Sequence, residues 1–330
     1  MTEQKENNLD RRQFIARAGK AGISIAAAGL IASKLYDKNG PTIGLEAKSL
    51  VNLPDFRVPD IPGRSISIIK GSDRKATVNK AIELLGGMGR FVEEGQTVAI
   101  KPNVAFASSP MLGATAHPDL VAEVVYLCYK AGAKQVIVTD NPINDPASCF
   151  TLSGIGKAAS QAGAKVILPK NHLFKHTTLA GGKLIRDWPV FFGPFEKVDK
   201  LIGISPVKDH ARAGASMSIK NWYGLLGGRR NVFHQDINTI ITELSMMVKP
   251  TLVILDGTEV MFSNGPTGGS VSDLRRADTL IASCDMVAAD SFGCGLLDLK
   301  VSDLPYLSKA EKNGTGTTDY KSLKPIFGAT

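Results

Sequence analysis

The densest group of chemically capable side chains lies just past the middle of the chain. It contains His210 and His234, together with Lys220, Asn221 and Arg229, around two glycine-containing turns. Imidazole rings transfer protons or bind metals, and lysine and arginine bind phosphate or carboxylate groups. A solvated basic loop has the same composition, but so many such groups in one short segment favour a functional site. We therefore expect a functional site in this segment, with His210 and Lys220 as catalytic residues, while binding of an anion, binding of a metal through imidazole and acid–base chemistry all stay open for the segment as a whole.

Other polar residues stand where strands are expected to end. Lys101 and Asn103 flank a proline and precede a helix start, which suits an anion, although a proline-terminated strand fits equally well. Asp140 and Asp256 follow two strands and could share a carboxylate site, whereas either one alone is also common turn chemistry. Gly265 lies in a Gly- and Asn-rich loop that suits either an anion or a lid. We assign catalysis to Asp256, and ligand or cofactor binding to Lys101, Asn103, Asn221, Arg229 and Gly265.

The elements that must position these residues follow from hydrophobic periodicity. Short runs rich in Ile and Val predict strands at residues 65–70, 97–101, 135–139, 165–168, 201–207, 251–256 and 279–283. The intervening segments predict helices at residues 74–85, 117–131, 154–162, 234–248 and 285–297. This alternation predicts an α/β fold with a mostly parallel sheet covered by helices on both faces. The fold would be Rossmann-like without a dinucleotide fingerprint, and its ligands would lie beyond the carboxyl ends of the strands.

Composition limits the class of function. The chain has 330 residues, 43% of them hydrophobic, and a formal net charge of +8, which fits a globular domain with a modest basic excess. Its basic residues are spread along the chain and only 6% of residues are aromatic, so we expect no nucleic-acid partner. The four cysteines form no C-x-x-C pair, which predicts no iron–sulfur cluster from this chain. They are Cys128, Cys149, Cys284 and Cys294.

The amino-terminal segment is typical of a twin-arginine export signal. Arg11 and Arg12 precede a weakly apolar run at residues 21–32, which is too short to settle as a membrane span. A basic amphipathic helix is the alternative interpretation. We expect a signal at residues 1–32, a linker at 33–62 and a single α/β domain at 63–330. The expected partner is then the export machinery, the expected location is periplasmic or extracellular, and membrane contact is confined to the signal.

Several motifs together resemble a known family. Over about residues 65–300 the chain resembles the family called domain of unknown function 362. The motifs are Lys101-Pro102-Asn103, residues 218–224, His234, Asp256-Gly257, residues 264–266 and Asp290. Many similar proteins carry ferredoxin modules, and this chain lacks their cysteines. The order of His210, Lys220 and His234 is also similar to the amino-terminal domain of nickel-pincer lactate racemases. That resemblance implies a pyridine-type cofactor on Lys220, its metal on His234 and proton transfer by His210.

These observations favour an exported enzyme that acts on a small anionic substrate with a bound metal or cofactor, and that is isomerase-like. Two alternatives remain open at the level of sequence. One is a non-catalytic periplasmic protein that binds an anion or a metal in the same cleft. The other is a maturation factor for another exported protein. A binder would only be stabilised by its ligand, whereas an enzyme would convert it.

Overall fold

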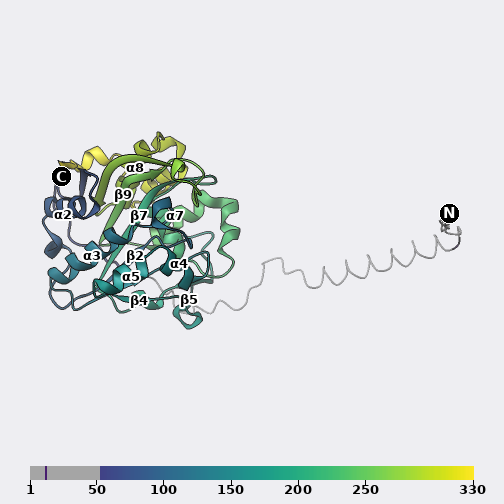
Figure 1. The fold of residues 1–330 in the computed structure, drawn as a ribbon. Coiled ribbons are helices and arrows are strands. Elements are labelled where there is room, and N and C mark those ends of the chain that lie inside the picture. Colours follow the sequence, from purple (N-terminus) through teal and green to yellow (C-terminus); the bar gives the residue numbers. More distant parts are fainter. Residues whose placement is uncertain (1–11, 13–52) are drawn as a thin grey trace, which may run out of the picture. The chain divides into compact units, whose positions relative to one another are not determined.

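The computed structural model describes residue 12 and residues 53–330 (Figure 1). The expected export signal therefore lies outside the described residues. Leu53 and Phe56 are buried, and the backbone of Asp55 bridges to Lys249. The domain thus begins before residue 63, where we placed its boundary, because apolar side chains in the expected linker pack onto it. Within residue 12 and residues 53–330, no helix has both the length and the apolar character needed to cross a bilayer.

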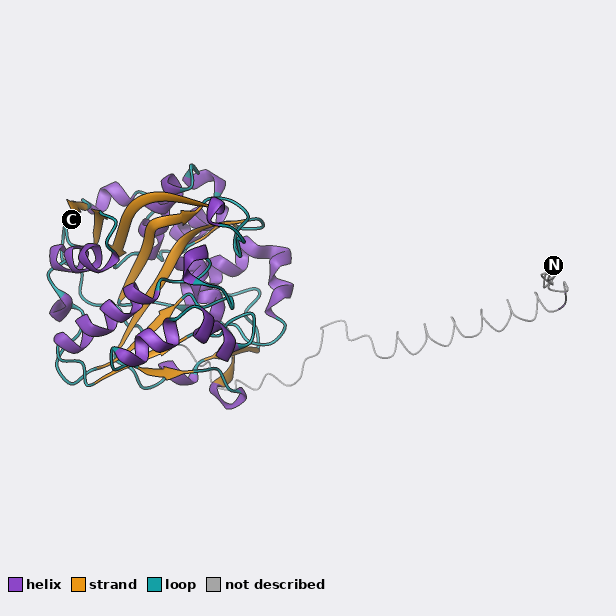
Figure 2. Cartoon of the chain, in the orientation of Figure 1, coloured by secondary structure: helices purple, strands orange, loops and turns teal. Residues whose placement is uncertain are grey.

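A mixed, mostly parallel sheet forms the centre of the domain (Figure 2). Its strand order is β11-β1-β10-β9-β7-β2-β3-β4, with β8 paired to β7. The neighbours β9, β7, β2, β3 and β4 run parallel, whereas β10 is antiparallel to both β9 and β1. The strands are β1 (Ile66–Lys70), β2 (Thr97–Pro102), β3 (Gln135–Thr139), β4 (Lys165–Ile167), β7 (Lys200–His210), β8 (Gly214–Ser216), β9 (Leu252–Met261), β10 (Leu274–Ser283) and β11 (Ile326–Ala329), with a separate pair β5 (Phe174–Thr177) and β6 (Trp188–Phe191).

Helices cover both faces of the sheet, as the sequence predicted. They are α2 (Arg74–Leu84), α3 (Pro118–Lys130), α4 (Pro146–Leu152), α5 (Ile155–Gln161), α6 (Ser218–Asn221), α7 (Ile237–Met247), α8 (Met286–Leu296) and α9 (Pro305–Lys312). One hydrophobic cluster packs α2 to α5 against one face, and a second packs α6 to α9 against the other. Successive strand residues alternate between them: Ile254 of β9 belongs to the first cluster and Leu255 to the second.

Local sequence signals account for where several helices begin. The carboxylate of Asp73 accepts hydrogen bonds from the N–H groups of Lys75 and Ala76, which caps α2 as expected. Pro118 occupies the first turn of α3, where a missing N–H costs nothing. These caps fix the direction in which each helix leaves the strand before it.

All seven expected strands and five expected helices are present, but their lengths differ in places and the structure adds elements that we did not expect: α4, α6, α9, β5, β6, β8 and β11. We expected the strand around residues 201–207 to end there, but β7 continues to His210 because β8 pairs with Lys208, Asp209 and His210. The polar end of β7 is therefore held on the sheet rather than on a loop. The short elements α6 and β8 have four and three residues, too few to give a periodic signal.

Candidate functional site

A cavity of about 260 Å³ lies beyond the carboxyl ends of β2, β3 and β7. Its walls come from the segments that follow these strands, from α6 and from the loop after β9. This is the edge of an α/β sheet at which ligands usually bind. The polar residues that line it are Asn103, Asp140, Asn141, Lys208, His210, Ser216, Lys220, Asn221, Tyr223, Arg230, Asn231, His234 and Thr267.

Five of the residues that we selected from the sequence line this cavity. They are Asn103, His210, Lys220, Asn221 and His234. Asn103 comes from the loop after β2, more than a hundred positions before the others, so the fold brings two distant motifs together. The expectation that strand ends converge on one polar site is met for these five.

Lys101 lies beneath the cavity and forms the structural base of the site. Its Nζ is 2.6 Å from Oδ1 of Asp140 and donates to Oδ1 of Asn221 at 2.9 Å. The other carboxylate oxygen of Asp140 accepts from the N–H of Val104 at 2.8 Å. Burial lowers the pKa of Lys101, while the charge of Asp140 offsets part of this effect. Lys101 therefore holds β2, β3 and α6 together and is not exposed to a ligand.

Lys208 and Lys220 carry the unpaired positive charge of the cavity. Burial lowers the pKa of each to about 7, and a neighbouring cation adds to the effect: Lys220 for Lys208, and Arg230 for Lys220. Nζ of Lys208 donates to the carbonyl oxygen of Ala114 at 2.6 Å. Within the described residues Lys220 has no carboxylate partner, and its Nζ lies 5.1 Å from the ring centroid of Tyr223. A bound anion would supply the negatively charged partner that both ammonium groups lack.

The two histidines have opposite tautomers. Nδ1 of His210 accepts hydrogen bonds from the N–H groups of Arg212 and Ala213, both at 3.2 Å, so the ring proton resides on Nε2. Nδ1 of His234 lies 3.3 Å from the carbonyl oxygen of Asn231, which can only accept, and 3.3 Å from the hydroxyl oxygen of Tyr223, whose proton is donated to the carbonyl of Arg230. Both contacts favour the proton on Nδ1 of His234. His210 therefore offers an Nε2–H donor, and His234 offers a free Nε2 lone pair.

The rings of His210 and His234 are stacked, with centroids 6.0 Å apart and planes inclined by 14°. Burial lowers the pKa of His210 to about 3 and also lowers that of His234, and Lys220 contributes to both shifts. Both rings are consequently neutral at neutral pH. Side by side, they present one hydrogen-bond donor and one proton acceptor.

Asp290 holds the helix that carries Lys220. It is fully buried in α8, and its carboxylate oxygens accept from the N–H groups of Ser218 and Ile219 at 2.7 and 3.0 Å. These bonds satisfy the free donors at the start of α6. Burial raises the pKa of Asp290 to about 7 despite the two bonds. Its presence among the family motifs was the only sequence signal for this role.

Besides Lys101, three selected residues do not line this cavity. Asp256 is not among the lining residues, and its Oδ2 lies 2.7 Å from Nε of Arg74 in α2. The reason is strand alternation: Asp256 is two residues after Ile254 and therefore faces the α2 side of the sheet, opposite α6. Arg229 is exposed, and the N–H of Gly265 donates to Asp209, so only the next residues of that loop reach the cavity.

Arg230, rather than its neighbour Arg229, faces the cavity. Its guanidinium donates to four backbone carbonyls, those of Asn141, Pro142, Tyr223 and Leu226. These bonds tie the loop after β3 to the segment after α6. Two adjacent arginines give the same sequence signal, so composition alone did not distinguish the buried one from the exposed one.

The donor set does not fit a metal centre made of protein side chains alone. Among residues 53–330 and residue 12, no three His, Cys, Asp or Glu side chains gather in a way that would hold an ion. His234 offers one free nitrogen, and Asp140 is already paired with Lys101. Three or more ligands are the usual requirement. A metal at His234 would need further ligands from a cofactor or a substrate.

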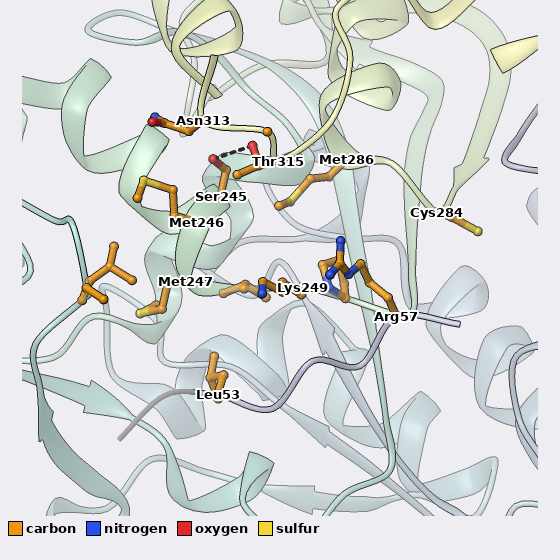
Figure 3. A pocket seen from close by; sticks show the side chains of 15 residues that line it. Leu53, Arg57, Ser245, Met246, Met247, Lys249, Cys284, Met286, Asn313 and Thr315 are labelled. Carbon is orange, nitrogen blue, oxygen red and sulfur yellow. Dashed lines mark hydrogen bonds between the residues drawn. The ribbon is translucent and has the colours of Figure 1, made fainter. Parts of the chain in front are cut away.

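A second cavity, of about 440 Å³, lies at the opposite edge of the sheet, near the start of β9 and the end of β10 (Figure 3). Its charged groups are already paired, because Arg57 and Lys249 both contact Asp55. Burial raises the pKa of Cys284 to about 11, so this thiol is not a nucleophile at neutral pH. The smaller cavity is therefore the one whose side chains are better suited to bind a ligand or to transfer a proton.

Gly224 provides a test of how tightly the base of the site is packed. A Cβ at this position would lie 2.3 Å from Oδ1 of Asp140 and 3.0 Å from Nζ of Lys101. We expect Gly224→Ala to lower the free energy of unfolding by about 1–3 kcal/mol, because it forces this ion pair apart. Urea unfolding measures the change. Gly89→Ala is the matched control, since its Cβ would meet nothing within 4 Å; an equal effect of both substitutions would refute the assigned packing.

The chain is similar to one curated protein and to two solved structures. The thylakoid-associated protein sll1697 of Synechocystis is 26% identical over 283 residues, which cover 80% of this chain and 84% of that protein. The two solved structures are the lactate racemase apoprotein of Thermoanaerobacterium thermosaccharolyticum (12% identity, TM-score 0.37) and a protein of Thermotoga maritima (15% identity, TM-score 0.35). The matches cover 74% and 68% of this chain but only 58% of each structure, less than two thirds of its length.

The family expected from the motifs is confirmed. A family model matches residues 98–295, which contain β2 to β10 and the described cavity residues. The chain belongs to the family described as domain of unknown function (DUF362).

Proposed function

We propose that this protein is an enzyme that binds a small organic anion in the cavity and transfers a proton on it. The observation that carries the proposal is the pair of neutral, stacked histidines with opposite tautomers beside Lys220. A donor and an acceptor of this kind are what proton transfer at a carbon next to a carboxylate or carbonyl requires. The unpaired lysines supply the attraction for the anion.

Each group has a distinct role in the proposed reaction. Nε2 of His234 takes the proton from the substrate carbon. The electron pair of the C–H bond then forms a double bond to the neighbouring carbonyl or carboxylate carbon, and the π pair of that C=O bond moves onto its oxygen. The Nε2–H of His210 and the ammonium of Lys220 stabilise the charge on that oxygen. Return of the proton to another face or atom would complete an isomerisation. This assignment gives His234, rather than His210, the role of base, and it uses no metal.

The charge of Lys220 should control anion binding. Because its pKa is about 7, the ammonium form is lost as the pH rises through neutrality. We expect acetate, whose own charge is constant in this range, to raise the Tm more at pH 6 than at pH 8.5. Lys220→Met should abolish most of this shift. Differential scanning fluorimetry with increasing acetate measures it, and an unaltered shift in the variant would contradict the proposal.

The same substitution should not destabilise the protein. The folded-state pKa of Lys220 lies below its ordinary value of 10.5, so the charged form opposes folding at pH 6, and this cost is relieved as the pH rises from 7 to 10. We therefore expect Lys220→Met to preserve or raise the Tm at pH 6. Each kcal/mol gained in the free energy of unfolding would raise the Tm by about 2–4 °C. Lys157→Met, at an exposed position of α5, is the control and should change neither property.

The histidine roles can be tested by hydrogen exchange. We would incubate the protein in deuterated water with a series of small 2-hydroxy acids and 2-oxo acids and follow the substrate C–H signals by proton NMR. We expect one acid to exchange a C–H for deuterium, at C2 of a 2-hydroxy acid or at C3 of a 2-oxo acid. His234→Gln should slow exchange by roughly 10²–10⁴-fold, and His210→Gln by roughly 10²-fold. His172→Gln, at an exposed position, is the control. If acids bind and none exchanges, the protein is an anion-binding protein instead.

We also infer from Arg11 and Arg12 that the chain is exported by the twin-arginine pathway to the periplasm or beyond. Replacing both residues by lysine keeps their charge but removes the paired guanidinium groups that define such signals. We expect this variant to remain in the cytoplasm of a bacterial host while the parent chain is recovered outside it. Cell fractionation with immunoblotting measures the distribution, and equal export of both chains would contradict the inference.

A further inference from the structure

Positively charged side chains outnumber negatively charged ones around the cavity. Lys208, Lys220 and Arg230 line it, and Asp140 is the one acidic side chain among its described lining residues. Asp140 is already committed to Lys101, at 2.6 Å. Three cations are therefore left without a carboxylate in a site of low solvent exposure, where an unpaired charge is costly.

The three cations differ in what they can offer a ligand. Arg230 donates to four backbone carbonyls, three through Nη1 and one through Nη2, so its guanidinium is held by the backbone and contributes mainly positive potential. Lys208 donates to Ala114 and, at 3.4 Å, to Asn103, which leaves a third hydrogen on its Nζ. Lys220 donates to no acceptor within residues 53–330. Two ammonium groups are thus available for direct contact.

These two ammonium groups stand on separate elements. Lys208 belongs to β7, where its side chain is held by the loop after β2, and Lys220 belongs to α6. Their mutual repulsion contributes to the lowered pKa of Lys208. One negative charge placed at either lysine leaves the other unpaired, whereas a ligand with two charges neutralises both. The volume of about 260 Å³ restricts that ligand to a small molecule.

We propose that the ligand of this cavity is a small dianion, with one negative charge for Lys208 and one for Lys220, as in a short dicarboxylate or a phosphate monoester. This inference rests on the proposed function and specifies its substrate class. The donor Nε2–H of His210 and the acceptor Nε2 of His234 then face the part of the ligand between or beside the two charged ends.

Matched pairs of ligands test the charge without changing the size. We would compare succinate with succinamate, and methyl phosphate with methyl sulfate, by isothermal titration calorimetry at pH 7.5. One member of each pair carries two negative charges and the other carries one. We expect the dianion of at least one pair to bind at least about 10-fold more tightly than its partner. The pair that shows the preference identifies a carboxylate or a phosphate as the second charge.

Variants of Lys208 then locate the second charge. We expect Lys208→Met to remove the preference for the dianion while acetate binding through Lys220 persists, and Lys208→Arg, which keeps the charge, to retain the preference. Equal affinity within both pairs would overturn the inference even if the Met variant fails to fold, since that comparison uses the unaltered protein. Binding of acetate without a dianion preference would leave the proposed function intact, whereas absence of all anion binding would refute both.

Discussion

The buried contact between Lys101 and Asp140 is the constraint on which the rest of the site depends. Removing two charges from water is expensive, and the attraction between them offsets that cost only when their remaining hydrogen-bonding groups are also satisfied. Asn221 and the N–H of Val104 meet this need. Because these partners come from β2, β3 and α6, satisfying one ion pair also fixes the three elements that carry the cavity. The absence of a side chain at Gly224 gives this arrangement its space.

The groups above this base lower the stability of the folded state. Lys208 and Lys220 are held in a confined space without carboxylates, at a cost to the folded state that two hydrophobic clusters must offset. Burial of the Asp290 carboxylate is a second cost to the folded state, and the hydrogen bond that it accepts there holds the start of α6. The different partners of the two Nδ1 atoms favour opposite tautomers: backbone N–H groups face His210, whereas a backbone carbonyl and the hydroxyl of Tyr223 face His234. Local geometry thus sets the chemical difference between two identical side chains.

Much of the fold, and part of the site, follows from the sequence. Hydrophobic runs located the strands, and helix caps such as Asp73 located helix starts, because these signals are local. The convergence of Asn103 with His210 and Lys220 followed from the rule that parallel strands end at one edge. The direction of individual side chains did not follow. Asp256 faces the opposite side of the sheet, and Arg230 rather than Arg229 lines the cavity. A shift of one residue along the chain reverses the direction of a side chain, and the residue types alone do not reveal such a shift.

The position of β1 in the sheet has a consequence for how the chain acquires its structure. β1 comes first along the chain among the strands of this sheet, yet both of its neighbours, β10 and β11, come from residue 274 onward. During synthesis this strand must therefore wait, unpaired, until most of the domain has left the ribosome. Strands β3 and β7 both pair with β2 and come earlier along the chain, so these three strands can assemble first. Most of the cavity wall can then form before the sheet is complete.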